Sequence, residues 1–174
     1  KALAIHTADE AGSSPGPDYR FGWGLLNVSK ATELWLADFA SGAAAHIKQV
    51  VLLDGDYIEF PVVTDGAEPL KVTICWTDPQ GQIPPVSLNP TNRVLVNDLD
   101  LRVIRGVTTN CPWVLDPGNP QAGAPNGDNL RDNLWAELGL WYSKSALVQS
   151  LFTISSTSIR KREAPDTWFI SART

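Results

Sequence analysis

The sequence predicts a mainly β fold, an antiparallel jelly-roll-like β-sandwich that follows a short α-helical segment. Apolar and polar residues alternate along 70–78 and along 94–104, which is the pattern of strands with one buried face. The chain has 13 Gly and 13 Pro in 174 residues, a composition that suits short strands separated by many turns. Strand-like runs recur at intervals of roughly 8 to 14 residues with no helix signal between them. This spacing favours an antiparallel sandwich over a parallel α/β sheet.

Residues 1–41 form the predicted helical segment. Residues 1–8 are good helix formers that lack an N-cap, with Ala2, Ile5 and Ala8 at helical spacing, and we expect them to be the end of a helix. Asn27 is well placed as the N-cap of a short amphipathic helix over 28–35. Asn27 also opens an Asn-Val-Ser glycosylation acceptor, a role with which capping would compete.

Strands are predicted from residue 47 onward. The runs 47–53 and 57–63 flank Asp54-Gly55-Asp56, a hairpin-type turn signal. The runs 70–78 and 94–104 are expected to be neighbouring core strands joined by a Pro-rich loop. Their predicted buried face contains Leu70, Val72, Ile74, Trp76, Leu95, Leu99, Leu101 and Val103. Asn97 falls on the same face, so it must find hydrogen-bond partners if it is buried.

A long loop is expected over 105–133, because this stretch is rich in Gly, Pro, Asn and Asp. Trp113 and Val114 are expected to pin the middle of this loop to the sandwich. Of the seven Trp residues, Trp76 is assigned to the core and Trp35 to the seam between the helical segment and the sandwich.

Composition excludes several classes of function. The net charge of −5 gives no support for nucleic-acid binding, which usually needs a basic stripe. No apolar run reaches the roughly 18 residues of a membrane-spanning helix. The chain has no initiator Met and no signal-like start, so we expect it to be part of a longer protein. Cys75 and Cys111 could form one disulfide or remain separate thiols.

Four segments of the sequence resemble a known family. They are LKVTICWTDP and LVNDLDL in the predicted core strands, and HTADEAG and GPDYRFGWGLLN in the helical segment. Together they are similar to the C-terminal end of the catalytic domain, with the following β-sandwich, of subtilisin-like serine proteases (subtilases, peptidase family S8). The resemblance implies that 1–41 end a catalytic domain and that 42–133 form the accessory sandwich.

The resemblance also implies that this chain lacks the catalytic residues. The family's catalytic Ser lies in a Gly-Thr-Ser-Met-Ala-x-Pro motif upstream of the segment matched here, and its Asp and His lie further upstream. His6 and His46 match no catalytic position, and no substitute Ser/His/Asp spacing is present. The resemblance further implies an extracellular or extracytoplasmic location and an intramolecular contact with a catalytic domain. The sequence does not indicate an oligomeric state.

Acidic residues near the second core strand suggest a structural calcium site. Asp98 and Asp100 lie two residues apart, about 7 Å along a strand, and further oxygen donors come from Asp128 and Asp132. Such a site would fasten the loop to the sheet, and the resemblance implies calcium ligands at Asp100 and Asp128. The alternative is that these carboxylates are simply solvated. Zinc is not indicated, because the His and Cys residues show no paired ligand spacing.

The tail, residues 134–174, departs from the resemblance. Its charge balance turns from acidic to basic, and the family's last strands are not recognisable in it. One hypothesis is a shifted reading frame or a wrongly predicted exon after Asn133. The alternative is that 147–157 and 167–172, both rich in β-branched and aromatic residues, replace the last strands.

Two interpretations of function follow. In the first, the chain is the C-terminal fragment of a subtilisin-like serine endopeptidase, inactive alone, whose sandwich stabilises the catalytic domain. In the second, it is a stand-alone calcium-stabilised module that binds carbohydrate or a protein. The segment 19–31 favours the first interpretation, because a free-standing sandwich has no use for it.

Overall fold

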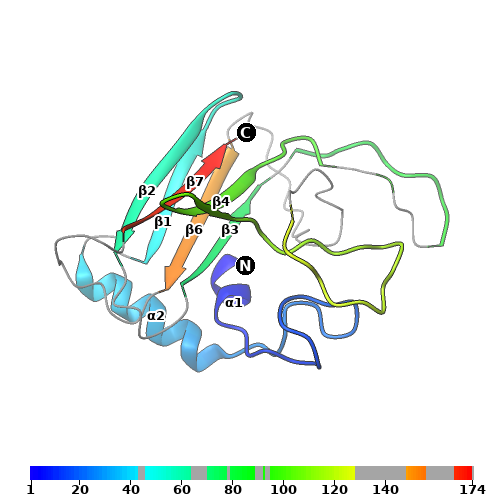
Figure 1. Cartoon of the computed structure of the whole chain (residues 1–174), viewed down its shortest axis with the longest axis horizontal. Coiled ribbons are helices and arrows are strands. Elements are labelled where there is room, and N and C mark those ends of the chain that lie inside the picture. Colours follow the sequence, from blue (N-terminus) through cyan, green and yellow to red (C-terminus); the bar gives the residue numbers. More distant parts are fainter. Residues whose placement is uncertain are drawn as a thin grey trace.

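The structure, a computed structural model, describes residues 1–42, 46–63, 70–77, 79–88, 92, 95–127, 148–155 and 167–173. Within these residues the fold is mainly strand with few helices, which confirms the predicted β content (Figure 1). The elements, in order, are α1 Ala2–His6, α2 Val28–Ser41, β1 Ile47–Leu52, β2 Tyr57–Val63, β3 Lys71–Trp76, β4 Asp100–Arg105, β5 Thr108–Asn110, β6 Val148–Ser155 and β7 Thr167–Arg173.

The described strands form two sheets. Within each sheet, neighbouring strands pair in antiparallel fashion. One sheet has the order β1-β6-β3 and the other the order β2-β7-β4-β5. The strands β6 and β7, which come late in the sequence, are therefore central strands that join early strands to each other. Both strand-like runs of the tail are strands in the structure, as their composition predicts.

The core consists of two clusters that contain side chains from both sheets. Leu99 is fully buried and packs with Leu52, while Leu101 packs with Val62. The alternating residues of β3 pack against these clusters, as the sequence predicts, through Val72, Ile74 and Trp76. Burying one such leucine contributes about 1.5–3 kcal/mol.

The predicted hairpin between β1 and β2 is wrong, although its turn exists. The Leu53 backbone N–H donates to Asp56 Oδ2 over 3.0 Å, the Asp56 N–H donates to the Leu53 carbonyl over 2.9 Å, and Gly55 has a φ of 82°. However, β1 pairs with β6 and β2 pairs with β7. The turn carries the chain from one sheet to the other, because the apolar faces of both strands belong to the same core.

The strands β3 and β4 are also not neighbours in a sheet. They belong to different sheets, and side chains from both strands pack in the same cluster with Val62. A hydrogen bond links β3 to the segment before β4, in which Trp76 Nε1 donates to the Asn97 carbonyl over 3.2 Å. The loop after β3 is too long to require a hairpin. Regular strand pairing begins only at Asp100, so the predicted second strand was too long.

The helix α2 is longer than predicted. Its N-cap is Asn27, as expected, and the Lys30 N–H donates to Asn27 Oδ1 over 2.9 Å. The helix continues to Ser41 because no Gly or Pro interrupts it before Gly42, which ends it with a φ of 63°. This end coincides with the predicted boundary near residue 41.

The predicted long loop over 105–133 contains a strand that the sequence analysis missed. The strand β5 pairs with β4 through a tight turn at Gly106, where φ is 57°. Further along, Trp113 and Asn126 form an isolated antiparallel bridge. The stretch is therefore a hairpin followed by a folded loop over 111–127, as far as the described residues extend.

Candidate functional site

Only two of the four predicted calcium ligands, Asp98 and Asp100, are among the described residues. Asp98 and Asp100 are half-buried, and Asp100 Oδ1 lies 3.6 Å from Arg102 Nη2, so this carboxylate already has a cationic neighbour. Asp128 and Asp132 lie outside the described residues. Within the described ranges, no three His, Cys, Asp or Glu side chains gather as a metal site would require. The described donors therefore do not by themselves make a calcium site.

The two cysteines do not form a bridge. Cys75 in β3 and Cys111 after β5 are both half-buried, and neither is part of a disulfide. Of the two alternatives for this pair, the structure contains separate thiols.

The helix α1 packs against β3 and β6 at the centre of Figure 1, and we call this contact the seam. It holds the most completely built polar contact among the described residues. His6 is only 3% exposed, and its Nδ1 lies 3.0 Å from Thr73 Oγ1 on β3. Ala2, one helical turn earlier, is 1% exposed. The buried face of α1 is therefore formed by Ala2 and His6.

The surroundings of His6 favour the neutral form of its side chain over the protonated form. Burial, followed by the nearby charges of Lys71 and His46, lowers the pKa of His6 from 6.5 to about 4. The second ring nitrogen, Nε2, is buried and has no hydrogen-bond partner among the described residues. His6 is thus neutral near pH 7, and its Thr73 contact joins the helical segment to the sheet.

A second set of polar contacts ties the helical segment together. Asn27 Nδ2 donates to Asp9 Oδ2 over 2.8 Å, and the Lys30 ammonium pairs with the other oxygen of that carboxylate. Both partners hold the pKa of Asp9 below its ordinary value, with the Lys30 hydrogen bond the larger cause. These contacts fix the start of α2 on the segment that leaves α1.

The end of α2 is fixed to the start of the first sheet. Asp38 Oδ1 accepts hydrogen bonds from the backbone N–H of His46 over 2.7 Å and of Ile47 over 3.0 Å. The carboxylate thereby satisfies the first donors of β1. Together with the His6 contact, it anchors both helices to β1 and β3.

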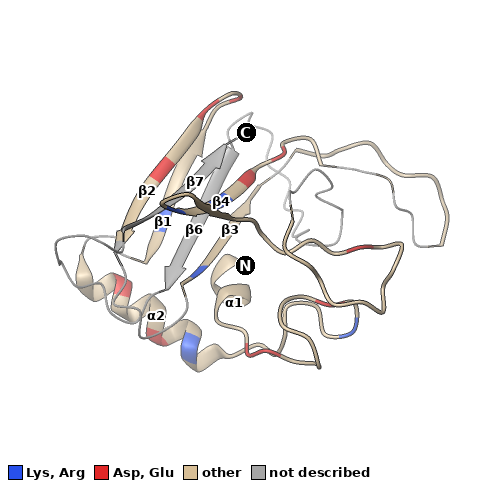
Figure 2. Cartoon of the chain, in the orientation of Figure 1, with Lys and Arg blue, Asp and Glu red and all other residues tan. Residues whose placement is uncertain are grey.

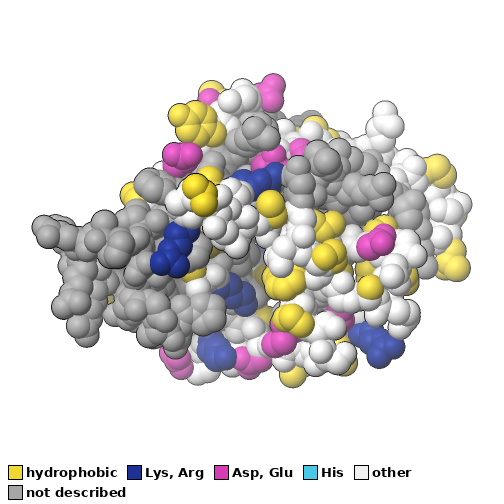
Figure 3. All heavy atoms as spheres, viewed as in Figure 1, with side chains coloured by type: hydrophobic (Ala, Val, Ile, Leu, Met, Phe, Trp, Pro, Cys, Tyr) yellow, Lys and Arg dark blue, Asp and Glu magenta, His cyan; other side chains and the backbone are white. Residues whose placement is uncertain are grey.

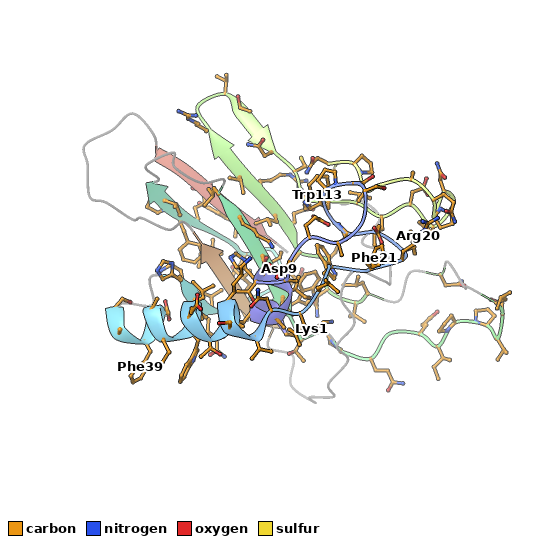
Figure 4. The ribbon with its side chains drawn as sticks, turned by 90° about the horizontal axis from the view of Figure 1, so that it is seen from below. Lys1, Asp9, Arg20, Phe21, Phe39 and Trp113 are labelled. Carbon is orange, nitrogen blue, oxygen red and sulfur yellow. The ribbon has the colours of Figure 1, made fainter. Side chains whose placement is uncertain are left out.

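The loop over 111–127 is pinned to the N-terminal loop, a contact that the sequence did not predict. A Cβ on Gly16 would meet the Trp113 ring at 2.7 Å, so the ring lies directly on that glycine. Nearby, Arg20 Nη2 donates to Gln121 Oε1 over 3.0 Å. Figure 4 shows Trp113 and Arg20 along this contact. Residues about 100 positions apart thus hold these two loops together.

One surface of α2 is apolar and uncovered by the described chain. We call it the α2 stripe, and it consists of Val28, Trp35, Leu36 and Phe39, which are 50–75% exposed. The rings of Trp35 and Phe39 stack with centroids 5.9 Å apart. Figure 4 shows Phe39 pointing away from the rest of the molecule. The placement of Trp35 against the seam was therefore wrong, since this side chain is on the outer face.

The helix α2 contacts the described chain through a narrow strip only. Ala31, Leu34 and Asp38 are half-buried, every other side chain of the helix is exposed, and none is buried. The charged residues of the described chain are scattered singly over several elements, without a basic stripe (Figure 2).

Comparison of the chain with protein-family models, with curated proteins and with solved structures finds no match. No helix among the described residues is long and apolar enough to cross a membrane.

Proposed function

We propose that this chain is the C-terminal part of a subtilisin-like serine endopeptidase, comprising the end of its catalytic domain and an accessory β-sandwich. The observation that carries the proposal is the α2 stripe. A helix of 14 residues with an apolar face needs a partner to bury that face, and within the described chain α2 buries no side chain. The catalytic domain, joined upstream of α1, is the partner we propose.

The β-sandwich part of the proposal is supported by the strand order. Successive strands from β1 to β4 alternate between the two sheets, and the apolar residues of both sheets meet in shared clusters. We assign this arrangement to a jelly-roll-like sandwich, in which two antiparallel sheets enclose one core.

The role we propose for the sandwich is to stabilise the catalytic domain. The His6 and Asp38 contacts join the helical segment to β3 and β1, so force or unfolding in one part is resisted by the other. Catalysis would depend on a Ser, a His and an Asp upstream. Calcium would add to this stability if Asp98 and Asp100 bind it with Asp128 and Asp132, because binding to the native state favours folding.

The proposal is tested by extending the protein upstream through its own coding sequence. We expect a Gly-Thr-Ser-Met-Ala-x-Pro motif in the added segment. We also expect the extended protein to be labelled by a fluorophosphonate, which reacts with activated serines, while residues 1–174 alone remain unlabelled. Replacing the motif Ser by Ala is the control. An upstream segment without the motif, or labelling that survives the Ser to Ala change, would contradict the proposal.

A further inference from the structure

The loop over 79–88, which follows β3, differs from the other described loops in its lack of hydrogen bonds. Its backbone makes no hydrogen bond to any other described residue. By contrast, the turn after β1 is closed by Leu53 and Asp56, the N-terminal loop by Asp18 and Gly22, and the loop over 111–127 by a bond from Val114. Only the loop over 79–88 can therefore leave its position without breaking described hydrogen bonds.

The same loop exposes large aliphatic side chains. Ile83 is 83% exposed, Leu88 is 94% exposed, and Val86 is as exposed as in an extended peptide. Figures 1 and 4 show the loop extending away from both sheets, and Figure 3 shows hydrophobic side chains on the surface at that end of the molecule. The residues 79–88 carry no charge. This is an uncharged, extended segment that another protein can reach.

One peptide bond in this loop suits hydrolysis by an endopeptidase. Endopeptidases bind their substrates as extended strands, and exposed loop tips are the preferred sites of cleavage. Pro84 and Pro85 favour an extended backbone. Among the bonds between described loop residues, only Val86–Ser87 has an aliphatic residue on its acyl side and a non-proline residue on its amine side. Val86 would fill a pocket for small aliphatic side chains.

We infer that the Val86–Ser87 bond is a processing site for a serine endopeptidase with a pocket for small aliphatic side chains, and that both pieces remain assembled after cleavage. In the reaction, water adds to the Val86 carbonyl carbon and the C–N bond breaks. Val86 becomes a new carboxylate and Ser87 a new ammonium group. The inference goes beyond the proposed function and does not depend on it, because any endopeptidase of this specificity can perform the step.

The strand order explains why the pieces would stay together. The N-terminal piece contains β1, β2 and β3, and the C-terminal piece contains β4 to β7. In the described sheets, β6 lies between β1 and β3, and β7 lies between β2 and β4. Three strand pairings and both core clusters therefore connect the two pieces. Cleavage removes one covalent link and leaves these contacts in place.

The chain offers an internal control for exposure. Val107 is 104% exposed, against 108% for Val86, but it lies in the tight turn between β4 and β5. Because the strands on both sides are paired, the Val107–Thr108 bond cannot adopt an extended conformation without breaking the hairpin. Exposure alone predicts equal cleavage after both valines, whereas the inference predicts cleavage after Val86 only.

The test is limited digestion of the intact chain with elastase, followed by mass spectrometry. We expect a cut after Val86 and none after Val107, and the pieces should elute together in native buffer and separate in urea. Ser87→Pro should abolish the cut, because proline then follows the scissile bond, while the control Gln80→Pro should retain it. Protein purified from its natural source should carry a Ser87 N-terminus.

The inference is overturned if elastase spares the Val86–Ser87 bond, if the Val107–Thr108 bond is cut at a comparable rate, or if the cut pieces separate in native buffer. It is also overturned if the natural protein remains whole at this bond.

Discussion

Acidification should destabilise the fold through His6, by an amount that the structure allows us to estimate. The pKa of His6 is about 4 in the folded protein and 6.5 for the ordinary side chain. Below pH 6.5 the unfolded chain therefore binds a proton that the folded chain excludes, so the free energy of unfolding falls as the pH drops from about 6.5 to about 4. A difference of 2.5 pKa units corresponds to about 3 kcal/mol once both states are protonated.

The measurement is urea unfolding at a series of pH values between about 7 and about 4, for the natural chain and for His6→Asn. Asparagine places an amide where Nδ1 meets the Thr73 hydroxyl, but it does not titrate. We expect the natural chain to lose about 3 kcal/mol more than the variant over this range, equivalent to roughly 6–12 °C in Tm. Carboxylates such as Asp9 titrate in both proteins, so their contribution cancels in the difference.

A parallel fall in the stabilities of the two proteins would refute this reasoning, since it would mean that His6 accepts its proton equally well in both states. The matching control is His46→Asn. His46 is a minor cause of the lowered pKa of His6, so this variant should keep most of the pH dependence.

Three further predictions concern the seam and the helical segment. Lys71→Met should raise the pKa of His6 in an NMR titration, because it removes a nearby positive charge; an unchanged or lower value would contradict the contact. Asn27→Ala should cost about 1 kcal/mol in urea unfolding, because the α2 cap is lost, and unchanged stability would show that the cap is not used. Gly24→Ala should cost more than about 2 kcal/mol, because φ is +101° and the new Cβ would lie 2.1 Å from a backbone carbonyl oxygen. The control Gly22→Ala, also at positive φ but with open space around it, should cost less when thermal melts of the two variants are compared.

The sequence predicted which faces of the strands are buried but not which strands pair. Alternation along β3 identifies Val72, Ile74 and Trp76 as core residues, and the structure confirms them. The same alternation is compatible with any partner strand, so a turn signal at Gly55 could not distinguish a hairpin from a change of sheet. The pairing depends on β6 and β7, which lie about 100 residues further along the chain.

The seam was missed for a related reason. The short helix α1 carries several apolar residues, and its sequence alone does not say which face meets the sheet. Ala2 and His6 are one helical turn apart, which was the available signal, but a histidine is an uncommon choice for a buried face. Its partner Thr73 is 67 residues away and faces α1 only once β3 is in place.

For the candidate metal ligands, the sequence could not show which other side chains lie next to them. The spacing of Asp98 and Asp100 correctly indicated two acids near the start of β4, but not their neighbours. Arg102, two residues further along the same strand, lies beside Asp100. The other two expected ligands, Asp128 and Asp132, lie outside the described residues, and calcium binding stays a prediction.

The account depends most on the α2 stripe being an interface with an upstream catalytic domain. Hydroxyl-radical footprinting of Trp35 and Phe39 tests this directly, in residues 1–174 alone and in the protein extended upstream. We predict strong oxidation of both rings in the shorter chain, where they are 53% and 75% exposed, and protection in the extended protein. Equal oxidation in the two proteins would show that nothing upstream covers this helix and would contradict the account.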